Sequence, residues 1–238
     1  MSDSLKFPQE SVDFNVALTL SLVIFGFDGV ELQVLTVPSS NEPFKGALML
    51  PSKYLGAKDE LLLSARRTFE NLFGEQKEVT IEQLRAFGGV YRHPMGRVVN
   101  VPHYALVKKI GFKDDKWEKL NFKWHPARLI PDLAFDHNEI VEYAKERLKR
   151  RVKRRPVGFH LLDEEFTLGQ LQNLYESALG KKFDRRNFRK KLFKTTLVID
   201  LDKEADGSKN GQKKGSKLFK FNFDQYKKMK IEGYDFLF

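Results

Sequence analysis

Residues 55–75 contain the charged side chains whose spacing comes closest to a catalytic arrangement. A turn of small residues leads into the helical pattern DELLLSARRTFENLFG, which ends at Gly74. A metal-dependent catalyst would need several carboxylates on the polar face of this helix, because a hard divalent cation requires several oxygen ligands. That face carries few of them, so the segment has the length of a catalytic helix without its full set of ligands.

The other residue types add little catalytic potential. The chain has no cysteine, which excludes disulfides, thiolate nucleophiles and thiolate metal sites. No two histidines stand at metal-ligand spacing on a predicted helix, so each is interpreted as a hydrogen-bonded or surface residue. We therefore predict no metal site and no cofactor. The five histidines are His93, His103, His125, His137 and His160.

Positive charge is concentrated in the C-terminal part of the chain. Residues 1–144 hold 17 Lys and Arg against 19 Asp and Glu, a net charge of −2. Residues 145–238 hold 25 against 13, a net charge of +12. This asymmetry favours a polyanionic partner for the second part, with nucleic acid preferred, and a solvated basic surface is the alternative.

The first part of the chain is predicted to be an α/β/α sandwich within the α+β class. Two β-rich runs flank Asp28-Gly29, a strong hairpin signal. RVVNVPHYALVKKI, residues 97–110, predicts one long strand. A second helix is expected from Asn138 to about Val152, with Asp136 as its cap. Apolar residues at helical spacing define the buried side of that helix: Ile140, Val141, Ala144, Leu148 and Val152.

Pro156 ends this helix, and we place a domain boundary there, between residues 1–155 and 156–238. In the second domain, Thr167 and Gln170 predict a capping box at the start of a helix that stops at Gly180. Asp184 caps the next helix, RRNFRKKLFK. Two β-rich runs with a basic loop between them follow, and this order predicts a winged helix-turn-helix.

The basic helix and the basic loop are the predicted DNA contacts. Arg and Asn side chains suit bidentate reading of guanine and adenine edges, and lysines suit the phosphate backbone. A solvated surface helix with an unconstrained loop is the alternative. The predicted DNA-binding residues are Arg185, Arg186, Asn187, Arg189 and Lys190 on the helix, and Lys213, Lys214 and Lys217 on the loop.

The segment LPSKYLGAKDELLLSARRTFENLFGE resembles the Nudix box, G-x5-E-x7-R-E-U-x-E-E-x-G-U, in register. Arg67 and Gly74 match the Arg and the closing Gly of the box, and Asp59 matches its first Glu. In Nudix hydrolases the later glutamates hold the magnesium ions that activate water. Three other residues stand at those positions here: Thr68, Asn71 and Leu72. The resemblance therefore implies that hydrolysis is lost and that the chain is not an enzyme.

The resemblance extends along the whole chain. AFGGVYRHPMGRVVNVPHYALV, IPDLAFDHNEIVEYA and the segment from PVGFHLLDEEF to GSKLFKFN look like the Nudix-related transcriptional regulators. This family implies a sensor domain that binds a small effector without turnover, a winged helix that binds double-stranded operator DNA, and a homodimer. It also implies an effector that is either ADP-ribose or a pentose such as L-arabinose, with the arabinose branch expected. The candidate effector-binding residues are Lys53, Arg67, Asn71 and Arg97.

These observations predict a cytoplasmic, sequence-specific DNA-binding regulator. Its longest apolar run, from Val16 to Phe27, is too short to span a bilayer. Two other functions stay open. One is a magnesium-dependent hydrolase of nucleoside diphosphate derivatives that uses displaced acids, Glu70, Glu75 and Asp59. The other is a sequence-tolerant RNA- or DNA-binding module.

Overall fold

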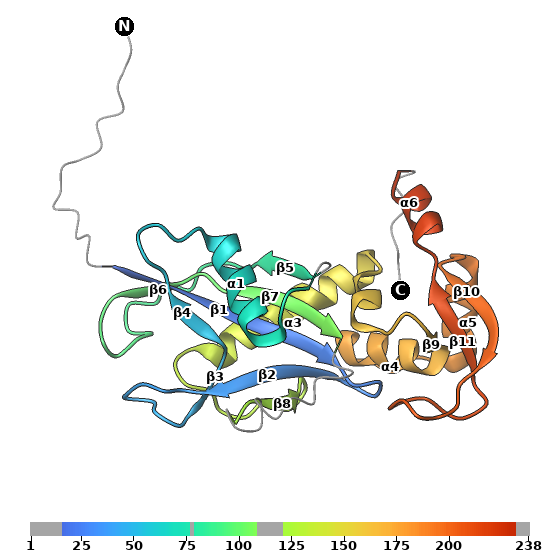
Figure 1. The fold of residues 1–238 in the computed structure, drawn as a ribbon, viewed down its shortest axis with the longest axis horizontal. Helices are drawn as coiled ribbons and strands as arrows, with labels where there is room; N and C mark the ends of the chain where they lie inside the picture. Colours follow the sequence, from blue (N-terminus) through green and yellow to red (C-terminus); the bar gives the residue numbers. More distant parts are fainter. Residues whose placement is uncertain (1–15, 77–78, 109–120, 232–238) are drawn as a thin grey trace, which may run out of the picture.

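The computed structural model describes residues 16–76, 79–108 and 121–231. Within these residues a mixed sheet with helices on both faces is joined to a smaller unit built on a three-stranded sheet (Figure 1). The elements are β1 (Ala17–Phe27), β2 (Leu32–Pro38), β3 (Leu48–Met49), β4 (Ser52–Tyr54), α1 (Leu61–Phe73), β5 (Thr80–Gln83), β6 (Val98–Asn100), β7 (His103–Lys108), β8 (Lys123–Pro126), α3 (His137–Arg154), η1 (Val157–Leu161), β9 (Phe166–Thr167), α4 (Leu168–Leu179), α5 (Arg185–Lys194), β10 (Val198–Glu204), β11 (Lys217–Phe221) and α6 (Phe223–Ile231).

Strand β1 is the centre of the larger sheet. It pairs antiparallel with β2 and β4 and parallel with β6 and β7. Most of its residues are buried on both sides, because α1 covers one face of the sheet and α3 covers the other. Successive side chains of a strand point to opposite faces. Val23, Phe25 and Phe27 therefore join the core on the α3 side, and Leu20, Leu22 and Ile24 join the core on the α1 side. The predicted α/β/α sandwich is confirmed.

Helix α3 has the predicted buried side, and it ends as Pro156 requires. Arg155 is extended, with φ −139° and ψ 148°. The predicted capping role of Asp136 was wrong, although the residue stands at the N-cap position. Its side chain forms no capping hydrogen bond. The carboxylate instead accepts two hydrogen bonds from Arg92, and a guanidinium is a stronger partner for a carboxylate than a backbone amide.

The prediction of one long strand over residues 97–110 was also wrong within the described residues. The segment forms two short strands, β6 and β7, with Pro102 between them, and Lys109 and Ile110 lie outside the described residues. Proline has no N–H to donate to a neighbouring strand, so the ladder breaks there.

The hairpin at Asp28-Gly29 is confirmed, but its connection is the four-residue turn 28–31. Asp28 stabilises that turn by accepting hydrogen bonds from the amides of Val30 and Glu31.

The second unit has the predicted winged-helix order. The capping box of Thr167 and Gln170 starts α4, and Gly180, in the left-handed conformation with φ 65°, ends it. Asp184 accepts a hydrogen bond from the amide of Asn187 at the start of α5. Strand β11 lies between β10 and β9 in the small sheet. The chain continues into α6, which the sequence patterns did not predict.

One buried apolar cluster runs from β1 through α3 into α4 and α5, so the two units share a core. The boundary at residues 155 and 156 stays a prediction. No helix among the described residues is long and apolar enough to cross a membrane.

Candidate ligand cavity and nucleic-acid surface

The sandwich contains a cavity of about 650 Å³ at the end of the sheet where β1 begins and β2 ends. Its size lies within the range of small-molecule sites. The walls come from β1, β4, the segment after β2, α1, the loop 88–97 and the start of α3. The residues that line it are Thr19, Ser21, Val37, Pro38, Ser39, Ser40, Asn41, Glu42, Met49, Pro51, Ser52, Lys53, Tyr54, Thr68, Asn71, Leu72, Arg92, His93, Met95, Phe122, Phe135 and His137.

Helix α1 contributes an uncharged wall. Its three lining side chains are Thr68, Asn71 and Leu72, the residues at the glutamate positions of the box. The Thr68 hydroxyl donates a hydrogen bond of 2.8 Å to the Ser64 carbonyl one turn earlier. The wall therefore offers one amide and no carboxylate. Among the described lining residues, Glu42 is the only acid.

The acids of the hydrolase alternative lie outside this lining. The Asp59 carboxylate accepts a hydrogen bond of 2.9 Å from the Gly56 amide and pairs with Lys53 at 3.2 Å. The Gly56 hydrogen bond, followed by Lys53, lowers the pKa of Asp59. Glu70 pairs with Arg66 at 3.8 Å, and Glu75 is exposed. Within the described residues no three His, Asp or Glu side chains converge as a metal site would require.

Hydroxyl and amide groups form the polar part of the cavity. Asn100 donates a hydrogen bond of 2.7 Å to the Ser21 hydroxyl. Ser21 and Ser52 share one of 2.8 Å, and Ser52 donates to the Leu50 carbonyl at 2.9 Å. This chain fixes the two serine hydroxyls in a wall of the cavity, where they are suited to a ligand that carries hydroxyl groups.

Aromatic rings form another part of the lining. The His93 ring stacks on Phe135 with 4.9 Å between centroids and 13° between planes. Its Nδ1 accepts a hydrogen bond from the Met95 amide, so in the neutral ring the proton is on Nε2, which donates to the Tyr54 hydroxyl at 3.2 Å. Burial lowers the pKa of His93, which favours this neutral form. Flat neutral rings of this kind suit stacking against a heteroaromatic base.

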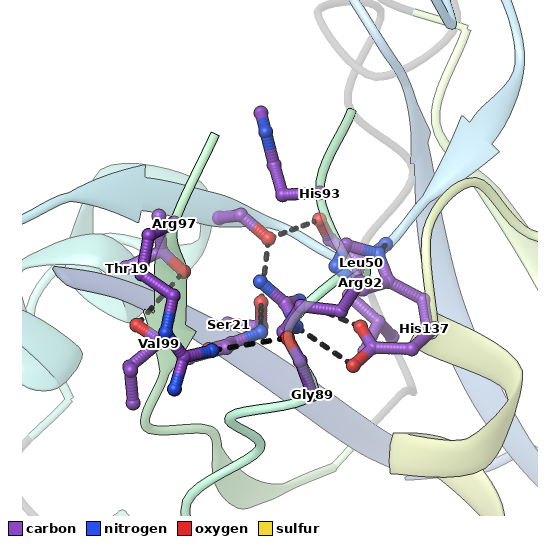
Figure 2. Close-up of polar contacts among 12 residues, drawn as sticks. Thr19, Ser21, Leu50, Gly89, Arg92, His93, Arg97, Val99 and His137 are labelled. Carbon is purple, nitrogen blue, oxygen red and sulfur yellow. Dashed lines mark hydrogen bonds and ion pairs between the residues drawn. The ribbon is translucent and has the colours of Figure 1, made fainter. Parts of the chain in front are cut away.

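His137 is a buried neutral histidine in the lining. Its side chain is 2% exposed, and its Nδ1 accepts a hydrogen bond of 3.1 Å from the Leu50 amide (Figure 2). Burial lowers its pKa to about 4, against a smaller opposing effect of Asp136. At neutral pH the ring therefore carries one proton, which must be on Nε2.

Two cations, Lys53 and Arg92, line the cavity. Arg92 donates hydrogen bonds of 2.7 and 2.6 Å to the two carboxylate oxygens of Asp136, and its side chain is 5% exposed. Figure 2 shows this guanidinium lying between the loop 88–97 and the start of α3. Each cation already has one acid, since Lys53 pairs with Asp59, so the net positive charge of the lining is small.

The structure brings together two of the four predicted effector-binding residues. Lys53 and Asn71 line the cavity. Arg67 is exposed on α1 outside the lining. Arg97 donates hydrogen bonds of 2.6 and 3.1 Å to the carbonyls of Gly88 and Gly89 and also lies outside it (Figure 2). Sequence reasoning missed further lining residues: Tyr54, Arg92, His93, Phe135 and His137. The sequence signal that could have indicated two of them is the adjacent Arg92 and His93 in the segment YRHPMG.

The basic helix predicted to contact DNA is α5, and it presents its polar side to solvent. Phe188 and Leu192 are buried and attach α5 to the core. On the opposite side Arg185, Arg186, Asn187 and Lys190 are exposed. Arg189 is partly covered, and its pKa is lowered by burial and by Arg185. Four of the five residues predicted on this helix are thus exposed and accessible to a groove of DNA.

The lysines of the basic loop differ in their partners. Lys213 and Lys214 are exposed, and neither forms an ion pair among the described residues. Lys217 pairs with Asp200 at 2.8 Å, and Lys209 pairs with Asp163 at 2.9 Å. Only the first two have an uncompensated charge to offer a phosphate.

Residues 158–221 match the family described as NrtR DNA-binding winged helix domain. The ADPR responsive transcriptional repressor NtrR of Acinetobacter baylyi is 28% identical over 213 residues, which cover 88% of this chain and 83% of that protein. The crystal structure of Shewanella oneidensis NrtR superposes with a TM-score of 0.69 at 29% identity, covering 93% of this chain and 98% of the other.

The chain is similar over most of its length to Nudix-related transcriptional regulators. The likeness holds equally for Shewanella oneidensis NrtR in complex with a 27mer DNA, with a TM-score of 0.69, 29% identity and coverage of 92% and 97%. A MutT/nudix family protein from Enterococcus faecalis, at 22% identity and a TM-score of 0.64 over 87% of this chain and 88% of its own, shares the fold. The chain thus combines a Nudix-like sandwich with a C-terminal winged helix.

Proposed function

We propose that this regulator is an operator-binding repressor whose Nudix-like domain binds ADP-ribose without hydrolysing it. The observation that carries the proposal is the pairing of two features in one chain. One is a cavity whose α1 wall has an amide and no carboxylate; the other is an exposed basic helix in a winged-helix unit. The similar repressor of Acinetobacter baylyi is named for its response to ADP-ribose. The relatives described above give the pentose expectation no support.

The chemistry of the cavity suits a nucleoside diphosphate sugar. The ring pair of His93 and Phe135 offers a stacking surface for a base. The fixed hydroxyls of Ser21 and Ser52 suit ribose hydroxyls. Lys53 lines the cavity and would bind a diphosphate by exchanging its ion pair with Asp59 for the ligand. A pentose alone would fill a small part of a cavity of about 650 Å³.

The α1 wall supports binding without turnover. Hydrolysis of a diphosphate in this fold family uses magnesium held by glutamates, which neutralises the phosphates and activates water. Leu72 has no oxygen at its position, and Thr68 has only a neutral hydroxyl that donates its hydrogen to its own helix, so neither supplies the anionic oxygen of a glutamate. The bound diphosphate would then keep its bond, and binding energy would be available for a change of conformation.

DNA recognition is assigned to α5. Arg186, Asn187 and Lys190 are exposed on one side of a helix whose other side is anchored in the core. A homodimer would place two such helices on a two-fold symmetric operator. The molecular mass of the protein in solution tests whether it is a dimer.

The DNA assignment is tested by charge reversal. Arg186→Glu with Lys190→Glu is expected to abolish binding to the operator, measured by fluorescence anisotropy on fragments of the upstream region. The melting temperature should stay close to that of the wild type, because both residues are exposed. Arg147→Glu with Arg150→Glu, two exposed residues on α3, is the matched control for net charge. Unaltered binding by the α5 variant would refute the assignment, and footprinting that protects no bounded site would favour the sequence-tolerant module.

The effector is tested by calorimetry with ADP-ribose and with L-arabinose, followed by chromatography of ADP-ribose incubated with magnesium and protein. We expect ADP-ribose to bind and L-arabinose to give no measurable heat of binding. We also expect the incubated ADP-ribose to be recovered intact. Sustained magnesium-dependent turnover would support the hydrolase alternative instead.

A further inference from the structure

The basic loop of the winged helix contacts the sensor domain directly. The loop between β10 and β11, residues 205–216 and here called the wing, reaches the turn 28–31 at the tip of the β1–β2 hairpin (Figure 1). A Cβ atom added to Gly29 would overlap the backbone carbonyl of Asn210, and one added to Gly211 would overlap the carbonyl of Gly29. Both glycines have positive φ, 94° and 74°. The two backbones therefore touch where only glycine fits.

Helix α4 fastens this contact from one side. Gln170 donates a hydrogen bond of 2.9 Å to the Asn210 carbonyl, and Asn173 donates one of 3.3 Å to the Gly29 carbonyl. The Ser177 hydroxyl accepts a hydrogen bond of 2.8 Å from the Leu32 amide. These three α4 residues are three and four positions apart, so they share one face of the helix. That face binds the wing and the sensor turn together.

The same hairpin also forms part of the cavity. Thr19 and Ser21 on β1 and Val37 and Pro38 on β2 line it, at the end of the hairpin opposite to the turn. Ser21 and Asp28 are seven positions apart, which is roughly 23 Å of strand at about 3.3 Å per residue. A shift of these strands at the cavity would therefore be carried to the turn, since paired strands move as a unit.

The contact leaves the free cations of the wing accessible. Lys213 and Lys214 stay exposed while Asn210 and Gly211 are docked. Lys209 adds a further tie through its ion pair with Asp163. A loop fixed in this way loses less conformational entropy when its lysines bind phosphate.

We propose that the turn 28–31 is a latch that holds the wing in its DNA-binding arrangement, and that a ligand in the cavity lowers DNA affinity by acting on this latch through β1 and β2. The identity of that ligand rests on the proposed function, whereas the latch itself does not. Linkage requires that operator DNA lower the affinity for the ligand by the same factor.

The test is Gly29→Ala in the full-length chain, with Gly74→Ala as the matched control. Both glycines have positive φ, 94° and 72°, but a Cβ on Gly74 meets nothing within 4 Å. Without any ligand, Gly29→Ala is expected to lower operator affinity about three- to tenfold, the size expected for ordering a short loop. Amide hydrogen exchange over residues 205–216 should become faster. With ADP-ribose added, the loss of operator affinity should be less than half of the wild-type loss on a logarithmic scale, although ADP-ribose still binds the variant within about twofold.

Asn173→Ala gives a second variant without backbone strain, and it should shift the same measurements in the same direction by smaller amounts. Wild-type operator affinity and wild-type exchange in both variants would overturn the latch, and an unchanged ADP-ribose effect would overturn its coupling to the cavity. If the wild type fails to bind ADP-ribose, the proposed effector is refuted, and the ligand-free affinity and exchange measurements still decide on the latch.

Discussion

Arg92 and Asp136 join two segments that are 44 residues apart in sequence, through hydrogen bonds of 2.7 and 2.6 Å in a fork geometry. The side chains are 5% and 17% exposed, so this ion pair is largely shielded from water. It connects the cavity loop 88–97 to the first turn of α3. The position of one cavity wall therefore depends on one pair of charges.

Removing one partner of that pair is expected to be costly. Arg92→Ala should lower the free energy of unfolding by about 3 kcal/mol, because a poorly hydrated carboxylate is left without its partner. Lys203→Ala, which breaks the exposed pair with Glu165, should cost no more than about 1 kcal/mol. Urea denaturation measures both. Equal losses in the two variants would show that the buried pair has no special role.

The buried His137 predicts a pH dependence of stability. Burial lowers its pKa in the folded state to about 4, from the usual histidine value of 6.5. As pH falls, the unfolded state binds the proton before the folded state does. The contribution of neutral His137 to the free energy of unfolding is therefore fully present above pH 6.5 and is lost progressively down to about pH 4. Burial is the main cause; Asp136 opposes it, and Arg92 and His93 reinforce it.

His137→Asn keeps an acceptor for the Leu50 amide but has no group that titrates in this range. Between pH 6.5 and about pH 4 its free energy of unfolding should therefore fall by about 3 kcal/mol less than that of the wild type. Denaturation midpoints at pH 7, 5.5 and 4.5 give the comparison. Burial also lowers the pKa of His93, His103 and His125 and leaves a residual slope of the same sign. A variant whose pH profile runs parallel to that of the wild type would contradict the prediction.

A carboxylate placed on the α1 wall should repel an anionic effector. Asn71→Glu is expected to weaken ADP-ribose binding about tenfold or more in the absence of divalent cations, since a like charge would then face the diphosphate. Magnesium should restore part of the affinity by bridging the two. Asn71→Gln is the neutral control and should bind within a fewfold of the wild type. Calorimetry with and without magnesium measures the ADP-ribose affinity of each variant. An unchanged affinity in Asn71→Glu would show that the diphosphate does not bind near residue 71.

The two kinds of wing lysine predict different salt dependences. Lys213→Gln with Lys214→Gln should reduce the slope of log affinity against log salt concentration by about 1.8 per protomer, at about 0.9 for each lost phosphate contact. Lys209→Gln with Lys217→Gln removes the same formal charge, but both lysines already pair with acids of their own unit. We expect less than half the change in slope. Identical slopes for the two double variants would mean that the internal ion pairs open on DNA.

Local elements of this protein followed from nearby residues in the sequence. The capping box of Thr167 and Gln170 and the cap of α5 by Asp184 are satisfied within one helical turn, so their sequence patterns were sufficient. The core side of α3 followed from apolar spacing for the same reason. Asp136 was misjudged because a competing partner, Arg92, comes from a distant loop.

The amino-acid sequence by itself determined helices α1, α3, α4 and α5, the two strands of the β1–β2 hairpin, and which acids are missing from the degenerate box. These depend on contacts within a few residues and on side-chain chemistry. The tertiary structure alone decided that Arg92, His93 and His137 enclose one cavity with Lys53 and Asn71. It also decided that the wing meets the turn at Gly29. Those contacts join residues dozens to more than a hundred positions apart, and they form only when the packing of the sheet and helices brings the segments together.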